Sequence, residues 1–290
     1  MPSNEQRRQT AQRKLERQLE RRAERDRKRK QMTIGASVLG VVLVIAAGAV
    51  VYGLTRSDDS SDATAAETTP TQEQAAAAMP AGRAEALPAT VDCSYVPDGQ
   101  APAKPANTPN GTAVSAEGVA EVTLATSQGT IGLSLDRAES PCTVNSFVSL
   151  AQQGYFDDTP CHRLSTTGLM ILQCGDPTGQ GTGGPGYGFD NEFPTDQYDE
   201  ADPAASEAVT YPRGTIAMAN TGMPGTNGSQ FFLVYDDSPL PPQYTVFGTI
   251  SEDGLATIEK VAEGGDDGSM SAGGGAPNTP IQIQTATVAA

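Results

Sequence analysis

Two short apolar segments joined by a polar turn constrain the fold of this chain more than any other feature. The first, residues 215–220 (TIAMAN), reads as a strand that ends in a small residue and an asparagine. The second, residues 227–232 (NGSQFF), begins with an Asn-Gly turn and continues into another apolar strand. The two segments predict neighbouring strands in a β-rich domain.

A further pair of segments upstream adds polar side chains to these strands. It contains Cys161, His162 and Arg163, followed by residues 173–176 (QCGD). Together the segments supply one arginine, two glutamines, one asparagine and several large apolar side chains, which strands can present on one face. No acid–base pair or set of metal ligands accompanies them in the sequence. This combination suits binding and distorting a peptide better than cleaving one.

The apolar pattern of the carboxyl-terminal part predicts a mainly β domain. Alternation with period two indicates a hairpin around residues 127–129, with core residues Val122, Leu124, Ile131, Leu133 and Leu135. Pro141 introduces a predicted helix that ends at Gly154, and residues 258–261 begin a second helix. Residues 281–283 supply a closing strand. Many strands with one or two helices are typical of a barrel.

Charge is distributed unevenly along the 290 residues. The chain carries 19 Lys and Arg against 35 Asp and Glu, a net charge of −16. Twelve of the basic residues lie within residues 1–31, which leaves seven in the rest of the chain against thirty acids. Because phosphate contacts need clustered Lys and Arg, we expect no nucleic-acid binding by the acidic part.

An uncharged apolar run over residues 33–54 predicts a membrane anchor, because about 20 apolar residues suffice to cross a bilayer. We therefore expect a basic cytoplasmic tail over residues 1–31 and a single transmembrane helix over residues 32–55 of a cell-membrane protein. The basic residues lie before the run and only Arg56 lies just after it, so the carboxyl-terminal domain is expected to be extracytoplasmic. A cleaved secretory signal is the alternative.

Residues 56–117 are rich in Ala, Thr, Pro, Ser and Asp and contain few large apolar residues. Such a composition cannot bury a core and predicts a disordered linker. The folded domain is then expected over residues 118–290.

The four cysteines all lie beyond the apolar run. An even number in an oxidising compartment is typical of two disulfides, which three connectivities satisfy. Cys161 and Cys174 flank a predicted hairpin and could face each other across it, and Cys93 would then remain with Cys142.

The motifs, taken in order, resemble those of the cyclophilins. The resemblance extends over about 170 residues and is carried by residues 122–124, 129–131, 143–147, 162–163, 173–176, 181–184, 189–193, 218–220, 227–232 and 246–248. It implies a closed eight-stranded β-barrel with two helices, here preceded by the single transmembrane helix and the disordered linker. It also implies peptidyl-prolyl cis-trans isomerase activity on X-Pro bonds.

The resemblance implies Arg163 and Gln173 as the catalytic residues. The implied substrate-binding residues are Met170, Ala219, Asn220, Gln230, Phe232, Leu240 and Tyr244. Neither a metal nor a cofactor is implied. His162 is expected to be a structural residue that points into the barrel, because neighbouring residues of a strand face opposite sides.

The sequence departs from the family at several positions. Met170 stands where Phe is common, Pro239 where many members carry Trp, and Tyr244 where many carry His. The alignment also needs two extra residues between Arg163 and Gln173.

The expected partners are proline-containing polypeptides outside the membrane, bound by a monomeric ectodomain. Two alternatives stay open at this point. One is a non-catalytic module of the same fold that binds proline peptides or acts as a chaperone. The other is a structural envelope protein, for which the acidic insert over residues 196–207 is a candidate docking surface.

Overall fold

The computed structural model describes residues 76–199 and 202–289. The predicted cytoplasmic tail, the predicted membrane helix and the beginning of the predicted linker lie outside the described residues and stay predictions. Within the described ranges, no helix is both long enough and apolar enough to cross a membrane.

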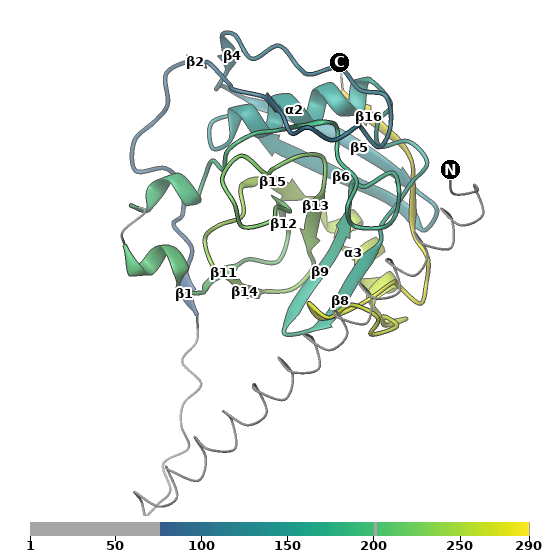
Figure 1. Ribbon diagram of the computed structural model, residues 1–290. Helices are drawn as coiled ribbons and strands as arrows, with labels where there is room; N and C mark the ends of the chain where they lie inside the picture. Colours follow the sequence, from purple (N-terminus) through teal and green to yellow (C-terminus); the bar gives the residue numbers. More distant parts are fainter. Residues whose placement is uncertain (1–75, 200–201, 290) are drawn as a thin grey trace, which may run out of the picture. The chain divides into compact units, whose positions relative to one another are not determined.

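One antiparallel sheet of nine strands forms the centre of the domain (Figure 1). Its order is β7-β16-β5-β6-β15-β12-β13-β9-β8. The strands are β5 (Val119–Thr126), β6 (Gly129–Asp136), β7 (Thr159–Pro160), β8 (Arg163–Thr167), β9 (Leu169–Cys174), β12 (Thr215–Met218), β13 (Phe231–Val234), β15 (Val246–Ile250) and β16 (Gln282–Val288). Only two residues join the outer strands β7 and β8, so the two edges of the sheet lie close together and the sheet curls.

The prediction of a closed eight-stranded barrel is wrong in this detail, because the sheet has nine strands and its order begins and ends at β7 and β8. Backbone amides at this junction have other partners. The amide of Cys161 donates to Ile281 O at 3.0 Å, and that of Leu164 donates to Gly275 O at 2.8 Å. Pro160, which ends β7, has no amide hydrogen to donate. The mainly β fold with two helices is confirmed.

The interior of the curled sheet is the main core. The five residues that alternate along the first hairpin are all buried, namely Val122, Leu124, Ile131, Leu133 and Leu135. Phe147 adds aromatic packing, with its ring centroid 4.8 Å from Phe156, 5.2 Å from Phe231 and 5.4 Å from Phe247. The hairpin expected from period-two alternation is confirmed.

Helix α2 (Pro141–Gln152) begins with the proline that the sequence indicated. The carboxylate of Glu192 accepts from the amides of Cys142 at 3.0 Å and Thr143 at 2.7 Å, so a distant side chain satisfies the free amides of the first turn. Gly154 has a φ of +66° just beyond the helix, a conformation in which glycine is favoured.

Helix α3 (Glu252–Ala262) packs on β6. Its N-cap is Ser251, whose hydroxyl accepts from the amide of Gly254 at 3.2 Å. Glu252 and Asp253 lie in the first turn and Lys260 in the last, which complements the helix dipole.

Smaller sheets surround the main one. They combine β1 (Ala77–Ala78), β2 (Thr90–Val91), β3 (Val96–Pro97), β4 (Val114–Ser115), β10 (Tyr187–Gly188), β11 (Val209–Tyr211) and β14 (Ser238–Leu240) in the orders β1-β11-β14, β10-β3 and β2-β4. Two short 3-10 helices, η1 (Thr195–Gln197) and η2 (Pro203–Ser206), lie in the acidic insert.

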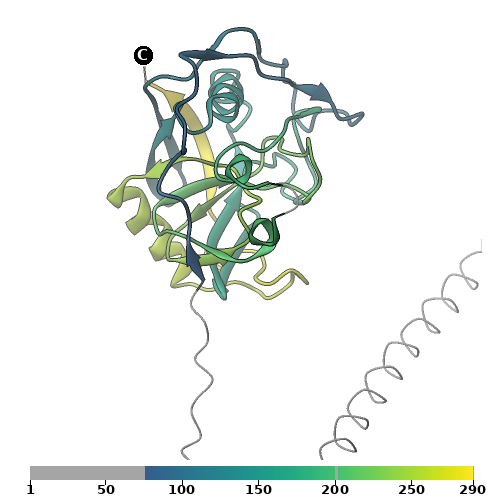
Figure 2. The same cartoon turned by 90° about the vertical axis from the view of Figure 1, so that its left-hand side faces the viewer.

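The prediction of disorder does not hold for residues 76–117, which pack along the domain in Figure 2. A disulfide joins Cys93 to Cys142 of α2. The ammonium of Lys104 donates to Gly154 O at 2.7 Å and to Asp157 O at 2.8 Å. A few anchoring contacts thus order a segment whose composition alone indicates disorder.

The second disulfide joins Cys161 to Cys174, and the described residues contain no free cysteine. Of the three possible connectivities, the structure has the one in which Cys161 and Cys174 face each other across the hairpin and Cys93 pairs with Cys142. The second disulfide thus links Cys161, which shortly precedes β8, to Cys174 at the end of β9.

Candidate functional site

Arg163 begins β8 and is held by three hydrogen bonds. Its Nε donates to Gly273 O at 3.0 Å, its Nη2 to Ala272 O at 3.0 Å and its Nη1 to Gln173 Oε1 at 3.4 Å. A guanidinium has five N–H donors, so two remain for a ligand. Burial lowers the pKa of Arg163 from its ordinary value, but an arginine stays protonated in proteins. The site therefore contains an oriented, permanently charged donor.

Two glutamines continue this chain of hydrogen bonds. Gln173 Nε2 donates to Gln230 Oε1 at 3.0 Å, and Gln230 Nε2 donates to Gly183 O at 3.0 Å. The predicted residues Arg163, Gln173 and Gln230 are thus brought together, and each amide group has a defined orientation.

The loop that carries Gly183 is organised by the buried carboxylate of Asp176. This carboxylate accepts from the amides of Thr178 at 2.8 Å, Thr182 at 3.0 Å and Gly183 at 3.0 Å, and from the hydroxyl of Thr178 at 2.8 Å. Burial raises the pKa of Asp176, but the hydrogen bonds from Gly183, Thr178 and Thr182 outweigh it and hold the pKa below its ordinary value. Asp176 is therefore ionised and anchors the far end of the chain of hydrogen bonds.

A second, smaller apolar cluster lies beside the polar residues. We call it the Phe232 cluster; its buried members are Ile171, Val209, Tyr211, Ala217, Phe232 and Val234. The rings of Phe232 and Tyr244 meet edge to face, with centroids 5.7 Å apart. Ala219, Leu240 and Tyr244 are partly buried and pack against the cluster, so four of the predicted substrate-binding residues share one apolar surface.

Strand register explains why the polar and apolar residues adjoin. Arg163 pairs with Gln173, Gln173 with Phe232, and Phe232 with Ala217, in one row across β8, β9, β13 and β12. Directly paired residues of neighbouring strands project to the same face. The row therefore presents the guanidinium, an amide and an aromatic ring side by side.

Met170 is the one apolar residue among the predicted substrate-binding residues that the structure does not place in or against this cluster. It packs against the main core, and its Sδ accepts from Tyr235 Oη at 3.6 Å. Its neighbour Ile171 is in the Phe232 cluster instead. Residues two apart on a strand share a face, so counting back from Gln173 would have identified Ile171.

Asn220 lies in the loop after β12. Its Nδ2 donates to Gln243 O at 2.9 Å and to Asn191 Oδ1 at 3.2 Å, and its Oδ1 accepts from the amide of Gly222 at 2.9 Å. The amide of Ala219 donates to Gln230 O at 2.9 Å. These bonds fix the backbone of the loop beside Gln230.

His162 directly precedes β8, is 7% exposed, and its imidazole lies beside Gly181. Burial lowers its pKa, with Arg163 acting in the same direction and Asp176 opposing. The imidazole is therefore neutral near pH 7. Among the described residues, no group of three or more His, Cys, Asp or Glu side chains is arranged to hold a metal.

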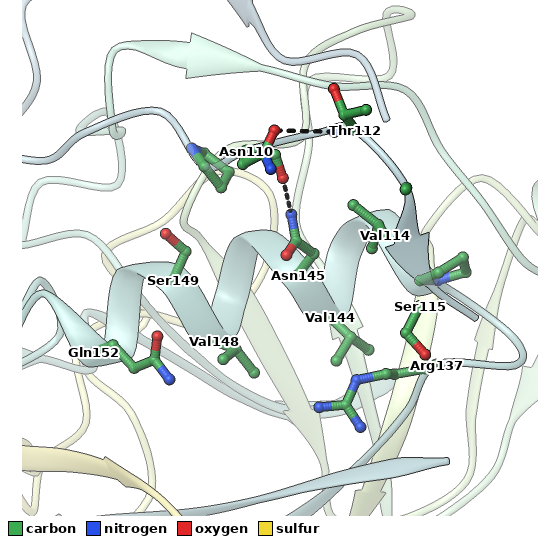
Figure 3. A pocket seen from close by; sticks show the side chains of 13 residues that line it. Asn110, Thr112, Val114, Ser115, Arg137, Val144, Asn145, Val148, Ser149 and Gln152 are labelled. Atoms are coloured by element: carbon green, nitrogen blue, oxygen red, sulfur yellow. Dashed lines mark hydrogen bonds between the residues drawn. The ribbon is translucent and has the colours of Figure 1, made fainter. Parts of the chain in front are cut away.

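A cavity of about 400 Å³ lies elsewhere, between α2 and the segment that precedes β5 (Figure 3). Its one charged lining residue is Arg137, whose Nη1 donates to Val119 O at 2.8 Å. None of the residues predicted to bind substrate lines this cavity, so it is separate from the candidate site formed by the row and the Phe232 cluster.

Comparison with known proteins places this geometry in a family context. Residues 121–288 match the family described as cyclophilin type peptidyl-prolyl cis-trans isomerase/CLD. A protein of Mycobacterium leprae named probable peptidyl-prolyl cis-trans isomerase B is 55% identical over 199 residues, which cover 67% of this chain and 66% of the relative. A protein of the same name from Mycobacterium tuberculosis is 56% identical over 198 residues, covering 68% and 62%. The match thus spans slightly less than two thirds of each relative.

Among solved structures, a cyclophilin type peptidyl-prolyl cis-trans isomerase of Cryptosporidium parvum is similar with a TM-score of 0.48 and 29% identity. The alignment covers 59% of this chain and 98% of that structure.

Proposed function

The chain belongs to the cyclophilin-type peptidyl-prolyl cis-trans isomerases, and we propose that its carboxyl-terminal domain isomerises X-Pro bonds at the row that Arg163, Gln173 and Phe232 form. The observation that carries the proposal is the guanidinium of Arg163, which is oriented by Gln173 beside the Phe232 cluster. A charged donor next to an apolar surface suits a proline ring and its amide nitrogen.

Rotation about an X-Pro bond is slow because it breaks amide conjugation, which costs about 18–20 kcal/mol. In the twisted transition state the prolyl nitrogen becomes pyramidal and gains a lone pair. A donor held at that nitrogen stabilises the twisted state more than either planar state, and only such differential binding accelerates the reaction. Arg163 supplies the donor, and the bonds to Gly273, Ala272 and Gln173 hold it in place.

The neighbouring residues bind the rest of the peptide. Phe232, Leu240 and Tyr244 contact the proline ring and exclude water. Gln230 and the backbone of the Ala219–Asn220 loop hydrogen-bond the peptide on either side of the proline. Rotation makes and breaks no covalent bond, so none of these residues needs to transfer a proton.

We further propose that the substrates are exported polypeptides, on which the domain acts outside the cell membrane as a monomer anchored by residues 32–55. The uncharged run with basic residues on one side supports this orientation. Two disulfides also support it, because such bonds persist in oxidising compartments.

The test is a protease-coupled isomerisation assay on the full-length chain with Xaa-Pro peptides. Arg163→Ala should lower kcat/KM by roughly 10²–10³, the usual effect of losing one preorganised donor. Arg163→Lys should recover only part of the rate, because an ammonium cannot span the three partners of the guanidinium. The matched control is Arg213→Ala, since Arg213 is an exposed arginine that binds Glu252 and Glu259 on α3.

The proposal is wrong if folded Arg163→Ala isomerises at the wild-type rate. A wild-type protein that binds proline peptides without isomerising them indicates the non-catalytic binding module instead.

A further inference from the structure

Residues 76–84 precede the part of the chain that matches the family, yet they reach the candidate site. We call these residues the strap. β1 pairs in parallel with β11, with Ala78 opposite Thr210, and β11 pairs with β14, with Val209 opposite Leu240 (Figure 1). Strand β1 of the strap is thus an outer strand of the small sheet whose other outer strand, β14, carries Leu240 of the proposed substrate site.

The strap is fixed to the domain at its carboxyl-terminal end as well. The side chain of Arg83 is only 8% exposed. Its Nε and Nη2 donate to Glu139 O at 2.9 and 2.6 Å, and its Nη2 forms an ion pair with Asp196 at 2.7 Å. The next amide, that of Ala84, donates to Gln197 Oε1 at 3.0 Å. A buried arginine with both backbone and carboxylate partners holds the strap in a defined position.

Met79 lies between these two attachments and packs against the Phe232 cluster. It is half-buried, so part of its side chain is accessible. Leu240 and Tyr244 pack against the same cluster. An unbranched thioether side chain adapts to ligands of different shape, which suits the margin of a site that accepts varied sequences.

We propose that Met79 forms part of the wall of the substrate site and determines preference for an apolar residue next to the proline. This inference rests on the proposed isomerase function. It assigns substrate selectivity to a segment outside the family domain, whereas Arg163 and Gln173 act on the prolyl bond itself.

The test uses the full-length chain and two series of Xaa-Pro peptides, in which the residue before or the residue after the proline is Phe or Ala. Met79→Ala should lower the kcat/KM ratio of Phe to Ala peptides by about tenfold in one series, through KM, because it removes apolar contact from a hydrophobic site. Met79→Leu keeps the apolar volume and should restore the ratio.

Two further variants distinguish an effect on the wall of the substrate site from an effect on the stability of the domain. Leu87→Ala removes a half-buried side chain that packs against neither core, and it should leave the ratio unchanged. Arg83→Met removes the second attachment of the strap, so it should lower the same ratio as Met79→Ala. Thermal unfolding of each variant confirms that the domain is folded.

The outcomes distinguish this inference from the function on which it rests. An inactive wild-type protein contradicts the proposed isomerase function. An active wild type in which Met79→Ala leaves both ratios unchanged, or slows Phe and Ala peptides equally, overturns the role of Met79 and leaves the isomerase intact.

Discussion

Asp176 offers the most informative single substitution, because its carboxylate anchors the hydrogen-bond chain that ends on Arg163. The chain runs from Asp176 through the amide of Gly183, from Gly183 O to Gln230, and from there to Gln173 and Arg163. Asp176→Asn keeps the shape of the side chain but replaces one acceptor oxygen with an NH₂ group.

Neither orientation of the new amide can preserve the network. If the NH₂ group of the new asparagine faces Thr182 and Gly183, the hydrogen bonds from both of their backbone amides are lost. If it faces Thr178, the 2.8 Å hydrogen bond from the backbone amide of Thr178 is lost. A hydrogen bond to a charged group contributes about 1.5–3 kcal/mol, so the free energy of unfolding should fall by at least about that amount. Displacement of Gly183 and Gln230 should lower kcat/KM by about 10- to 100-fold, since small misplacements are costly in catalysis.

The pH dependence provides an independent measurement. A carboxylate whose pKa is lower in the folded than in the unfolded protein contributes stability above its unfolded pKa of about 3.9. That contribution is lost as the pH falls through the lower, folded-state pKa. The wild type should therefore lose this part of its stability below about pH 4, and Asp176→Asn should lack it at every pH.

The assays are isomerisation kinetics and denaturant unfolding between pH 3 and 8. Asp190→Asn is the matched control, because Asp190 is an exposed acid that follows the same loop in the sequence. A folded Asp176→Asn with wild-type kcat/KM and stability would refute the argument that this carboxylate positions Arg163 through the glutamines.

Two further predictions follow from the surroundings of the row. Burial lowers the pKa of His162, so its neutral form stabilises the fold above about pH 6.5, and this stability is lost as the pH falls through the lowered pKa. In unfolding experiments His162→Gln should reduce this sensitivity to acid, while kcat/KM stays independent of pH between about 6.5 and 8. A change of kcat/KM with pH in this range would contradict the structural role of His162. Replacing Cys161 and Cys174 with Ser should lower the free energy of unfolding by about 2–5 kcal/mol in denaturant titrations, as is usual for loss of a native disulfide. An unchanged free energy of unfolding would show that this disulfide does not stabilise the domain.

Much of the row that Arg163, Gln173 and Phe232 form could be predicted from the sequence. Period-two alternation placed Leu124 and Leu133 in the core, and the order of the motifs indicated Arg163, Gln173 and Phe232. The alternation is a local pattern, since a strand that buries one face must alternate, whereas the residues of the row were implied by the resemblance to the cyclophilins. The pairing of Cys161 with Cys174 is likewise compatible with a local pattern, because a hairpin brings its two ends together.

Other features depended on contacts that no local pattern records. Alternation along β9 is enough to identify Ile171 in place of Met170, but its pairing with Val234 depends on the register between β9 and β13, which the sequence of either strand leaves open. The separation of β7 from β8 goes with backbone hydrogen bonds from Cys161 and Leu164 to Ile281 and Gly275, which lie more than a hundred positions away in the sequence.

The strap is the clearest example of a feature that local sequence patterns do not predict. Its composition is that of a disordered segment, and residues 76–84 bury little apolar surface by themselves. Their order comes from partners far along the chain, such as Asp196 for Arg83 and the Phe232 cluster for Met79. The sequence by itself determined the first hairpin and the two helices, and through the family resemblance it implied the residues of the row. Tertiary structure decided which distant segment packs against the Phe232 cluster, because only folding brings the partners that order that segment within contact distance.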